Sequence, residues 1–149
     1  MPKHIASGLR YLAAIKLRKQ GLSQQEIANE LNINRSTISH YLNGRNISKN
    51  AIDFAKVITE LNTQDFLLII QNLFENVNEI RIYTSIFKNE TYKGEINDSC
   101  IGCGLCVDLC ITKAISLDSL KAEINSMYCC GCRVCEEACP TDSIKVYGE

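Results

Sequence analysis

All nine cysteines of the 149-residue chain fall between positions 100 and 139, and this clustering constrains the fold more than any other feature. They belong to two segments, residues 100–115 and 129–144, which repeat with an offset of 29 positions. Both segments read C-x2-C-x2-C-x3-C, and they also share a glycine, a threonine and an isoleucine at equivalent positions. The first two-thirds of the chain has no cysteine, so this change in composition predicts a domain boundary.

The spacing within each repeat is typical of iron–sulfur chemistry. Three cysteines separated by two residues let one tight loop place three thiolates at the corners of a cuboidal cluster, and the fourth reaches the other cluster. We therefore predict two [4Fe–4S] clusters. The expected ligands are Cys100, Cys103, Cys106 and Cys139 for cluster 1, and Cys129, Cys132, Cys135 and Cys110 for cluster 2.

Other uses of the cysteines fit the pattern less well. Cys130 aligns with Ile101 of the first repeat, so we expect it not to be a ligand. Zinc modules usually combine two CxxC pairs separated by a dozen or more residues, which differs from two triplets with a distal fourth cysteine. We expect a cytoplasmic protein, where thiols stay reduced, so disulfides are not predicted.

The cysteine region closely resembles the bacterial two-cluster ferredoxins over residues 92–149. The resemblance implies a pseudo-twofold fold, in which a strand at 92–96 pairs with one at 143–147. A hairpin of residues 114–117 and 122–126 would cover the other side. One departure is Ile111, where that family usually has proline, whereas Pro140 keeps it in the second repeat.

The front of the chain predicts three helices, over residues 7–20, 24–31 and 34–43. The second has a capping box, in which the side chains and backbone N–H groups of Ser23 and Glu26 bond reciprocally. Asn32 follows where the chain must turn sharply, and asparagine tolerates the left-handed conformation. The apolar positions place one face of each helix inward.

This arrangement resembles the helix-turn-helix of phage-repressor-type transcriptional regulators over residues 7–47. The resemblance implies that residues 34–43 form a recognition helix that enters the major groove of double-stranded DNA. A helical bundle without DNA binding is the alternative. The candidate DNA-binding residues have side chains able to reach bases or phosphates: Gln24, Asn34, Arg35, Ser36, Thr37, Ser39, His40, Asn43 and Arg45.

The charge distribution favours the DNA-binding alternative. Residues 1–60 carry nine basic and four acidic side chains, whereas residues 61–149 carry seven basic and thirteen acidic ones. The net charges of +5 and −6 sum to the −1 of the whole chain. A basic front can approach phosphates and an acidic back is repelled by them.

The fold class expected from these patterns is α+β with two domains. Residues 1–62 form the helix-turn-helix domain, including a fourth helix that ends near residue 61. Residues 63–91 form a connector, with a helix at 63–77 and, because β-branched residues alternate there, a strand at 80–87. Residues 92–149 form the ferredoxin-type domain. The wide apolar face of the connector helix is either core or a homodimer interface, and both alternatives stay open.

Two functions follow. The first is a DNA-binding transcriptional regulator whose two clusters sense redox state, oxygen or iron. The second is a ferredoxin-type electron-transfer protein whose helical region docks a redox partner. The longest strongly apolar run, residues 66–70, is far too short to cross a bilayer, so no membrane association is expected. The sequence has no motif for a substrate pocket, a flavin or a nucleotide, and we expect no enzyme.

Overall fold

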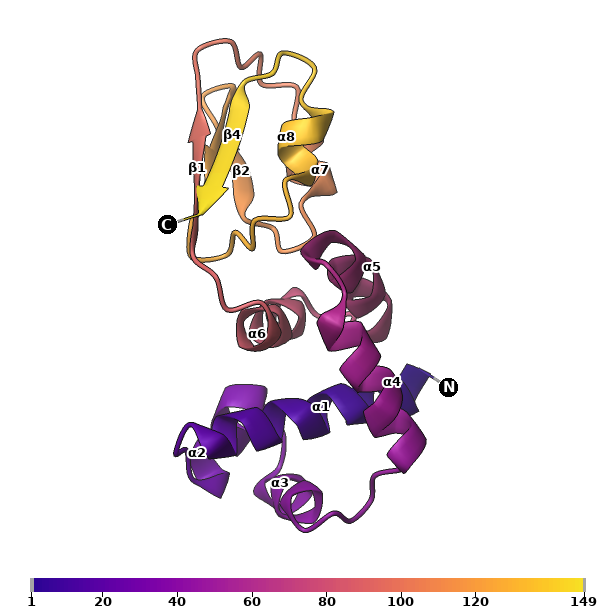
Figure 1. Ribbon diagram of the computed structural model, residues 1–149. Coiled ribbons are helices and arrows are strands. Elements are labelled where there is room, and N and C mark those ends of the chain that lie inside the picture. The colour runs from indigo at the N-terminus through magenta and orange to yellow at the C-terminus, as the bar shows by residue number, and fades with distance from the viewer. Residues whose placement is uncertain (1, 149) are drawn as a thin grey trace.

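The computed structural model describes residues 2–148, with side chains from residue 5 onward. Its fold is α+β, with six helices gathered at one end of an elongated molecule and two small sheets with two short helices at the other (Figure 1). The helical part consists of α1 (Pro2–Lys19), α2 (Gln24–Leu31), α3 (Arg35–Leu42), α4 (Lys49–Glu60), α5 (Thr63–Leu73) and α6 (Val77–Phe87). The cluster part follows from residue 92.

The turn between α2 and α3 forms as the sequence predicts. The backbone N–H of Ser23 donates to Glu26 Oε2 over 2.6 Å, and the N–H of Glu26 donates to Ser23 Oγ over 3.2 Å. Asn32 ends α2 in the left-handed conformation, at φ 52° and ψ 46°. These local bonds satisfy donors that a helix start leaves unpaired, and they fix the angle between α2 and α3.

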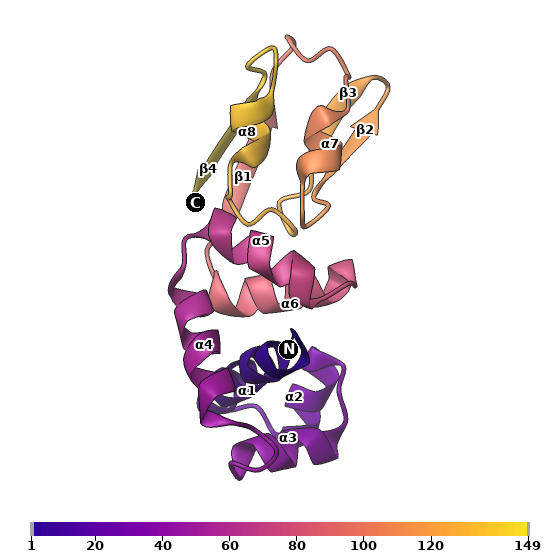
Figure 2. The same ribbon diagram turned by 90° about the vertical axis from the view of Figure 1, so that its right-hand side faces the viewer.

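Helix α1 is the central element of the helical part, because it contacts all five other helices of that part (Figure 2). Its closest neighbour is α4. A Cβ atom on Gly8 would lie 2.2 Å from the carbonyl oxygen of Ala51, so only glycine allows this approach. The shared core includes the fully buried Leu9, Ile27 and Phe66, from three different helices. Helices α1 to α6 therefore share one continuous core.

The strand expected at residues 80–87 is wrong, because this segment belongs to α6. Its β-branched residues also repeat at helical spacing, and Ile80, Tyr83 and Thr84 all face the interior. Asn76 caps the helix by accepting a hydrogen bond from the N–H of Asn78 over 2.8 Å. Burial against neighbouring helices outweighs the weaker preference of branched side chains for strands.

Helix α5 is also shorter than expected, since it ends at Leu73 rather than near residue 77. Its wide apolar face is mostly covered within the chain. Phe66, Leu67 and Ile70 are buried in the core, while Leu68 stays exposed. This face therefore serves the core of the single chain.

The cluster part has the expected pseudo-twofold arrangement. Strand β1 (Tyr92–Ile96) pairs antiparallel with β4 (Ile144–Gly148), with Tyr92 opposite Gly148 and Ile96 opposite Ile144. Strand β2 (Ile115–Asp118) pairs antiparallel with β3 (Lys121–Ile124), with Ile115 opposite Ile124. Helices α7 (Leu105–Leu109) and α8 (Val134–Ala138) occupy equivalent positions in the two repeats and lie side by side (Figures 1 and 2).

Candidate iron–sulfur centres and nucleic-acid interface

The four predicted ligands of cluster 1 line a single cavity in the cluster part. Cys100, Cys103 and Cys106 come from the loop before α7 and its first turn, and Cys139 comes from the end of α8. The cavity wall also contains Ile144 and Ala122. The fold thus brings three cysteines of one repeat together with the last cysteine of the other.

The four predicted ligands of cluster 2 line a second cavity, related to the first by the repeat. Cys129, Cys132 and Cys135 come from the loop before α8 and its first turn, and Cys110 comes from the end of α7. The ninth cysteine, Cys130, also lies in this wall. Both cavities therefore bring the cysteines together in the crossed arrangement that the spacing predicts.

Gly102 and Gly131 allow the loops of the two cavities to close. Both have positive φ, 68° and 73°. A Cβ on Gly102 would lie 2.2 Å from the carbonyl oxygen of Leu120, and one on Gly131 would lie 2.3 Å from the ring of Tyr92. Glycine is required at both positions, for its conformation and for its size.

The two crossing cysteines receive equivalent hydrogen bonds. The N–H of Ala114 donates to Cys110 Sγ, and the N–H of Ser143 donates to Cys139 Sγ, each over 3.3 Å. The hydroxyl of a threonine two residues on lies 3.6 Å from each sulfur. Such bonds stabilise a thiolate, and they are a means by which a protein tunes a bound cluster.

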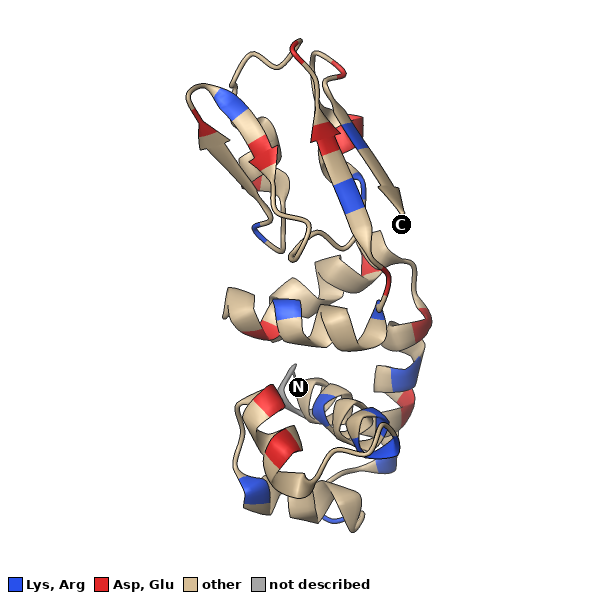
Figure 3. Ribbon diagram, turned by 90° about the vertical axis from the view of Figure 1, so that its left-hand side faces the viewer, with Lys and Arg blue, Asp and Glu red and all other residues tan. Residues whose placement is uncertain are grey.

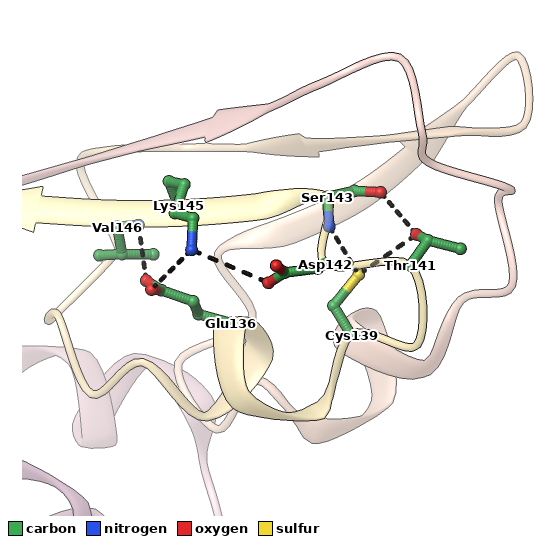
Figure 4. A network of polar contacts seen from close by, with 7 residues as sticks. All are labelled: Glu136, Cys139, Thr141, Asp142, Ser143, Lys145 and Val146. Carbon is green, nitrogen blue, oxygen red and sulfur yellow. Dashed lines mark hydrogen bonds and ion pairs between the residues drawn. The ribbon is translucent and has the colours of Figure 1, made fainter.

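A network of polar contacts surrounds Cys139 and the residues that follow it (Figure 4). The hydroxyls of Thr141 and Ser143 lie 2.5 Å apart. Lys145 Nζ lies 3.6 Å from Glu136 and 3.8 Å from Asp142, and Glu136 also accepts the N–H of Val146 over 2.9 Å. These contacts join α8 to β4, so they fix the segment that carries Cys139.

The donor set fits iron–sulfur clusters. Burial raises the pKa of Cys106 and of Cys129, and it raises the pKa of Cys135 to about 12. A bound cation such as cluster iron stabilises the thiolate and so deprotonates such thiols. Among the described residues, no three Cys, His, Asp or Glu side chains converge tightly enough for a single ion. The sulfurs surround a cavity, unlike the closed tetrahedron of a zinc site.

The cavity lined by the predicted cluster 2 ligands lies at the junction between the two parts of the molecule. Cys130 is only 8% exposed and belongs to the core of the helical part, against which Cys132 and Ile111 also pack. A hydrogen bond from Cys130 lowers the pKa of Cys132 to about 6. The packing of Ile111 gives a physical reason for its departure from proline, because the isoleucine adds an apolar contact across the junction.

Two polar side chains of the helical part bind the loops around cluster 2. Arg81 on α6 donates from Nε to the carbonyl of Thr112 over 2.8 Å and from an Nη to that of Lys113 over 3.1 Å. Its guanidinium lies 3.7 Å from the ring centroid of Tyr128. Gln64 on α5 donates to the carbonyl of Cys132 over 2.7 Å. No sequence pattern predicts these contacts, since they join residues more than 30 positions apart.

Helix α3 presents a polar face at the opposite end of the molecule. Tyr41, which is buried, packs edge-to-face on Tyr11 with ring centroids 6.4 Å apart, and so holds α3 against α1. The helix and the loop after it carry basic residues and no acidic ones (Figure 3). The exposed candidates are Asn34, Arg35, Ser36, Asn43 and Arg45, and the half-buried ones are Gln24, Thr37, Ser39 and His40.

Some candidate contacts are engaged within the chain. Asn43 donates from its amide to the carbonyl of Ser39 over 2.8 Å, so it caps the end of α3. Asn34 begins α3 without a side-chain capping bond. Lys16, which could have approached phosphates, instead donates to the carbonyl of Ile86 over 2.6 Å. Arg35, which is exposed in the first turn of α3, is therefore the most accessible cation of the expected recognition helix.

Comparison with known proteins agrees with both parts. Residues 12–53 match the family described as helix-turn-helix, and residues 99–143 match the family described as a 4Fe-4S dicluster domain. The chain is also 35% identical to the ferredoxin-type protein FwdE of Methanocaldococcus jannaschii over 150 aligned residues, covering 100% of this chain and 99% of the relative. No solved structure matches the chain. No helix in the described part of the chain is long and apolar enough to cross a bilayer.

Proposed function

The chain belongs to the family of the ferredoxin-type protein FwdE, and on this basis we propose that it is a DNA-binding regulator controlled by two [4Fe–4S] clusters. The observation that carries the proposal is the junction, where the loops of cluster 2 bind directly to the helices that support the helix-turn-helix. The protein acts on double-stranded DNA in the cytoplasm, and its role is regulatory rather than enzymatic.

The cluster ligands of this proposal are the two crossed sets. Cys100, Cys103, Cys106 and Cys139 hold cluster 1, and Cys129, Cys132, Cys135 and Cys110 hold cluster 2. Bound clusters supply one-electron redox chemistry and sensitivity to oxidants and to iron supply. The chain's own contribution is to bury the thiolates, donate hydrogen bonds to them and connect the loops to the helices.

Cluster binding and folding are coupled in a part with so little core. Its buried apolar residues besides cysteine are Ala114, Ile115, Ala122, Ile144 and Val146. A segment this small usually needs metal ligation to stay folded. Loss of the clusters therefore removes the surface against which Arg81 and Gln64 bind.

A chain of contacts leads from the junction to the recognition helix. Phe74, after α5, stacks on Tyr83 of α6 with centroids 4.5 Å apart, and Arg10 of α1 lies 5.4 Å from the centroid of Phe74. Helix α1 then supports α3 through Tyr11 and Tyr41. We infer that disorder at the junction loosens α5 and α6, and through α1 changes how α3 is presented to DNA.

We also propose a homodimer, because helix-turn-helix proteins commonly bind twofold half-sites. Helix α4 lies at the outer edge of the helical part (Figure 2). It exposes Phe54 and Val57, at 61% and 59%, which is unusual for large apolar side chains. Replacing Phe54 with lysine should convert a dimer to a monomer in light scattering, and an unchanged mass would exclude this face.

The second candidate function is electron transfer, favoured by the name of the relative, a ferredoxin-type protein that aligns with the whole chain. In this case the helical part would dock a redox partner and DNA would not bind. The two functions predict opposite results with duplex DNA, so they can be separated directly.

The test is duplex binding by anaerobically purified protein in its oxidised, reduced and cluster-free forms. The regulator proposal expects one form to select genomic fragments over random DNA. Arg35→Ala should weaken this binding without bleaching the clusters, whereas Cys132→Ala should lose iron. If no fragment binds better than random DNA in any form, the electron-transfer function is favoured. Equal DNA affinity in all three cluster states would support DNA recognition but exclude a sensing role for the clusters.

A further inference from the structure

The two repeats of the cluster part are alike in backbone but not in what covers them. Ile101 of the first repeat is 65% exposed, whereas Cys130, at the equivalent position of the second, is 8% exposed. Cys103 is exposed and its equivalent Cys132 is half-buried. The difference arises because the helical part covers the cluster 2 face, and no described residue covers the cluster 1 face in the same way.

The uncovered face is apolar. Ile101, Leu105 and Leu117 line the cluster 1 cavity, and Leu120, 77% exposed, lies in the turn between β2 and β3 beside Gly102. We call Ile101, Leu105, Leu117 and Leu120 the distal patch. It surrounds the loop that carries three of the cluster 1 cysteines, in the part of the molecule away from α1 to α6 (Figure 2).

The internal symmetry indicates what kind of surface fits the distal patch. On the cluster 2 side, an apolar helical face packs on the loop while Arg81 binds the carbonyls of Thr112 and Lys113. The equivalent carbonyls beside the distal patch are those of Thr141 and Asp142. A partner that reproduces this interface needs an apolar centre and a basic rim.

Charge favours the same partner. Residues 92–148 carry eight acidic and five basic side chains, and Asp98 and Asp118 lie in the segments next to the patch with only Lys121 to balance them. Four thiolates at each bound cluster add further negative charge. An acidic surface with an apolar centre attracts a basic partner and orients it on approach.

We propose that the distal patch is the docking surface for a second protein, a basic one-electron carrier with an apolar centre to its contact surface. Docking there places the carrier against the cluster 1 loop, where one electron passes from the reduced carrier to the group held by the thiolates. This inference extends the proposed function, because it identifies the partner that would set the state of the sensor.

The test measures binding of the anaerobically purified, cluster-loaded chain to cytochrome c, a basic one-electron carrier, by calorimetry at low ionic strength. The test variant combines Ile101→Asn with Leu120→Asn. Leu120 has φ 64°, a conformation that asparagine adopts easily, so the change should not disturb the turn. The matched control is Leu68→Gln, at an exposed apolar position of α5 outside the distal patch.

We expect the double variant to bind cytochrome c about tenfold more weakly or worse, while Leu68→Gln binds like the unmutated chain. Iron content and the visible spectrum should be unchanged in both. Equal affinity of the double variant and the unmutated chain would overturn the inference. So would weakening by Leu68→Gln alone, because Leu68 lies at the junction side and would place the partner near cluster 2.

Duplex binding by the same samples separates this inference from the proposed function. The double variant, reduced chemically, should bind DNA like the unmutated chain. If no sample selects DNA but the distal variant still loses cytochrome c, the regulator proposal fails and the docking surface stands. If DNA binding is normal and cytochrome c binding is unaffected, the docking surface fails and the regulator stands.

Discussion

Replacing Arg81 tests most directly whether the clusters and the helix-turn-helix are coupled. Its side chain makes two hydrogen bonds to carbonyls of the cluster 2 loop and stacks on Tyr128. Bonds from a charged donor contribute about 1.5–3 kcal/mol each, and a partly exposed cation–π contact adds about 0.5–1 kcal/mol. Because Arg81 is half-exposed, water replaces part of this when the side chain is removed. We expect Arg81→Ala to weaken the junction by about 2 kcal/mol, roughly thirtyfold in an equilibrium constant.

The assay compares DNA affinity in the cluster-loaded and cluster-free forms by fluorescence anisotropy, with a duplex selected from genomic fragments at fixed salt. The ratio of the two dissociation constants measures the coupling free energy between cluster and DNA sites. Arg81→Ala should move this ratio toward one by about tenfold or more, while the loaded protein keeps its iron. Arg81→Lys should act in the same direction but less, since lysine keeps the charge and loses the planar fork.

Lys121→Ala is the matched control, because Lys121 on β3 pairs with Asp98 over 3.0 Å, within the cluster part and not across the junction. It should leave the ratio unchanged. A ratio that stays within twofold of the unmutated value in Arg81→Ala, with full iron content, would refute the argument that the junction transmits cluster state.

Three further results are expected. Cys130→Ala should retain full iron and lose about 1 kcal/mol of stability in denaturant unfolding, since a buried atom is removed but no ligand; loss of iron would show that Cys130 is a ligand. Gly8→Ala should destabilise the helical part by about 1–3 kcal/mol in thermal unfolding followed by circular dichroism, because its Cβ would meet the Ala51 carbonyl. Burial raises the pKa of Tyr83 to about 12. Burial of the neutral phenol therefore contributes about 2–3 kcal/mol to the free energy of unfolding below pH 10, and this contribution is lost as the pH rises toward 12. Alkaline unfolding should therefore begin at higher pH in Tyr83→Phe.

The features that the sequence predicted correctly are those that short spacing determines. The interleaved cysteine triplets, the Ser23–Glu26 capping box and the left-handed Asn32 each depend on residues within a few positions. Such local chemistry can be predicted without knowledge of the tertiary structure. The strand pairs were expected from the resemblance to the two-cluster ferredoxins, and the structure has both of them.

Helix α6 shows where this reasoning fails. Its alternating branched residues satisfy the pattern of a strand, but Val77, Ile80, Thr84 and Phe87 satisfy that of a helix equally well. The start signal was present, since Asn76 is followed three positions later by Glu79. The choice is settled by burial against α1 and α5, which the sequence does not display.

The two repeats differ in sequence at positions that form the junction with the helical part. Tyr128, Cys130 and Ile111 stand where the other repeat has Ser99, Ile101 and Pro140. All three lie at the junction, with Tyr128 under Arg81 and the other two packed on the helical core. A ferredoxin-type part that worked alone would have no physical need for these changes on one side only. Their concentration on the cluster 2 side argues that the helices and the clusters act as one unit, and that the cluster 1 side was left free for a partner.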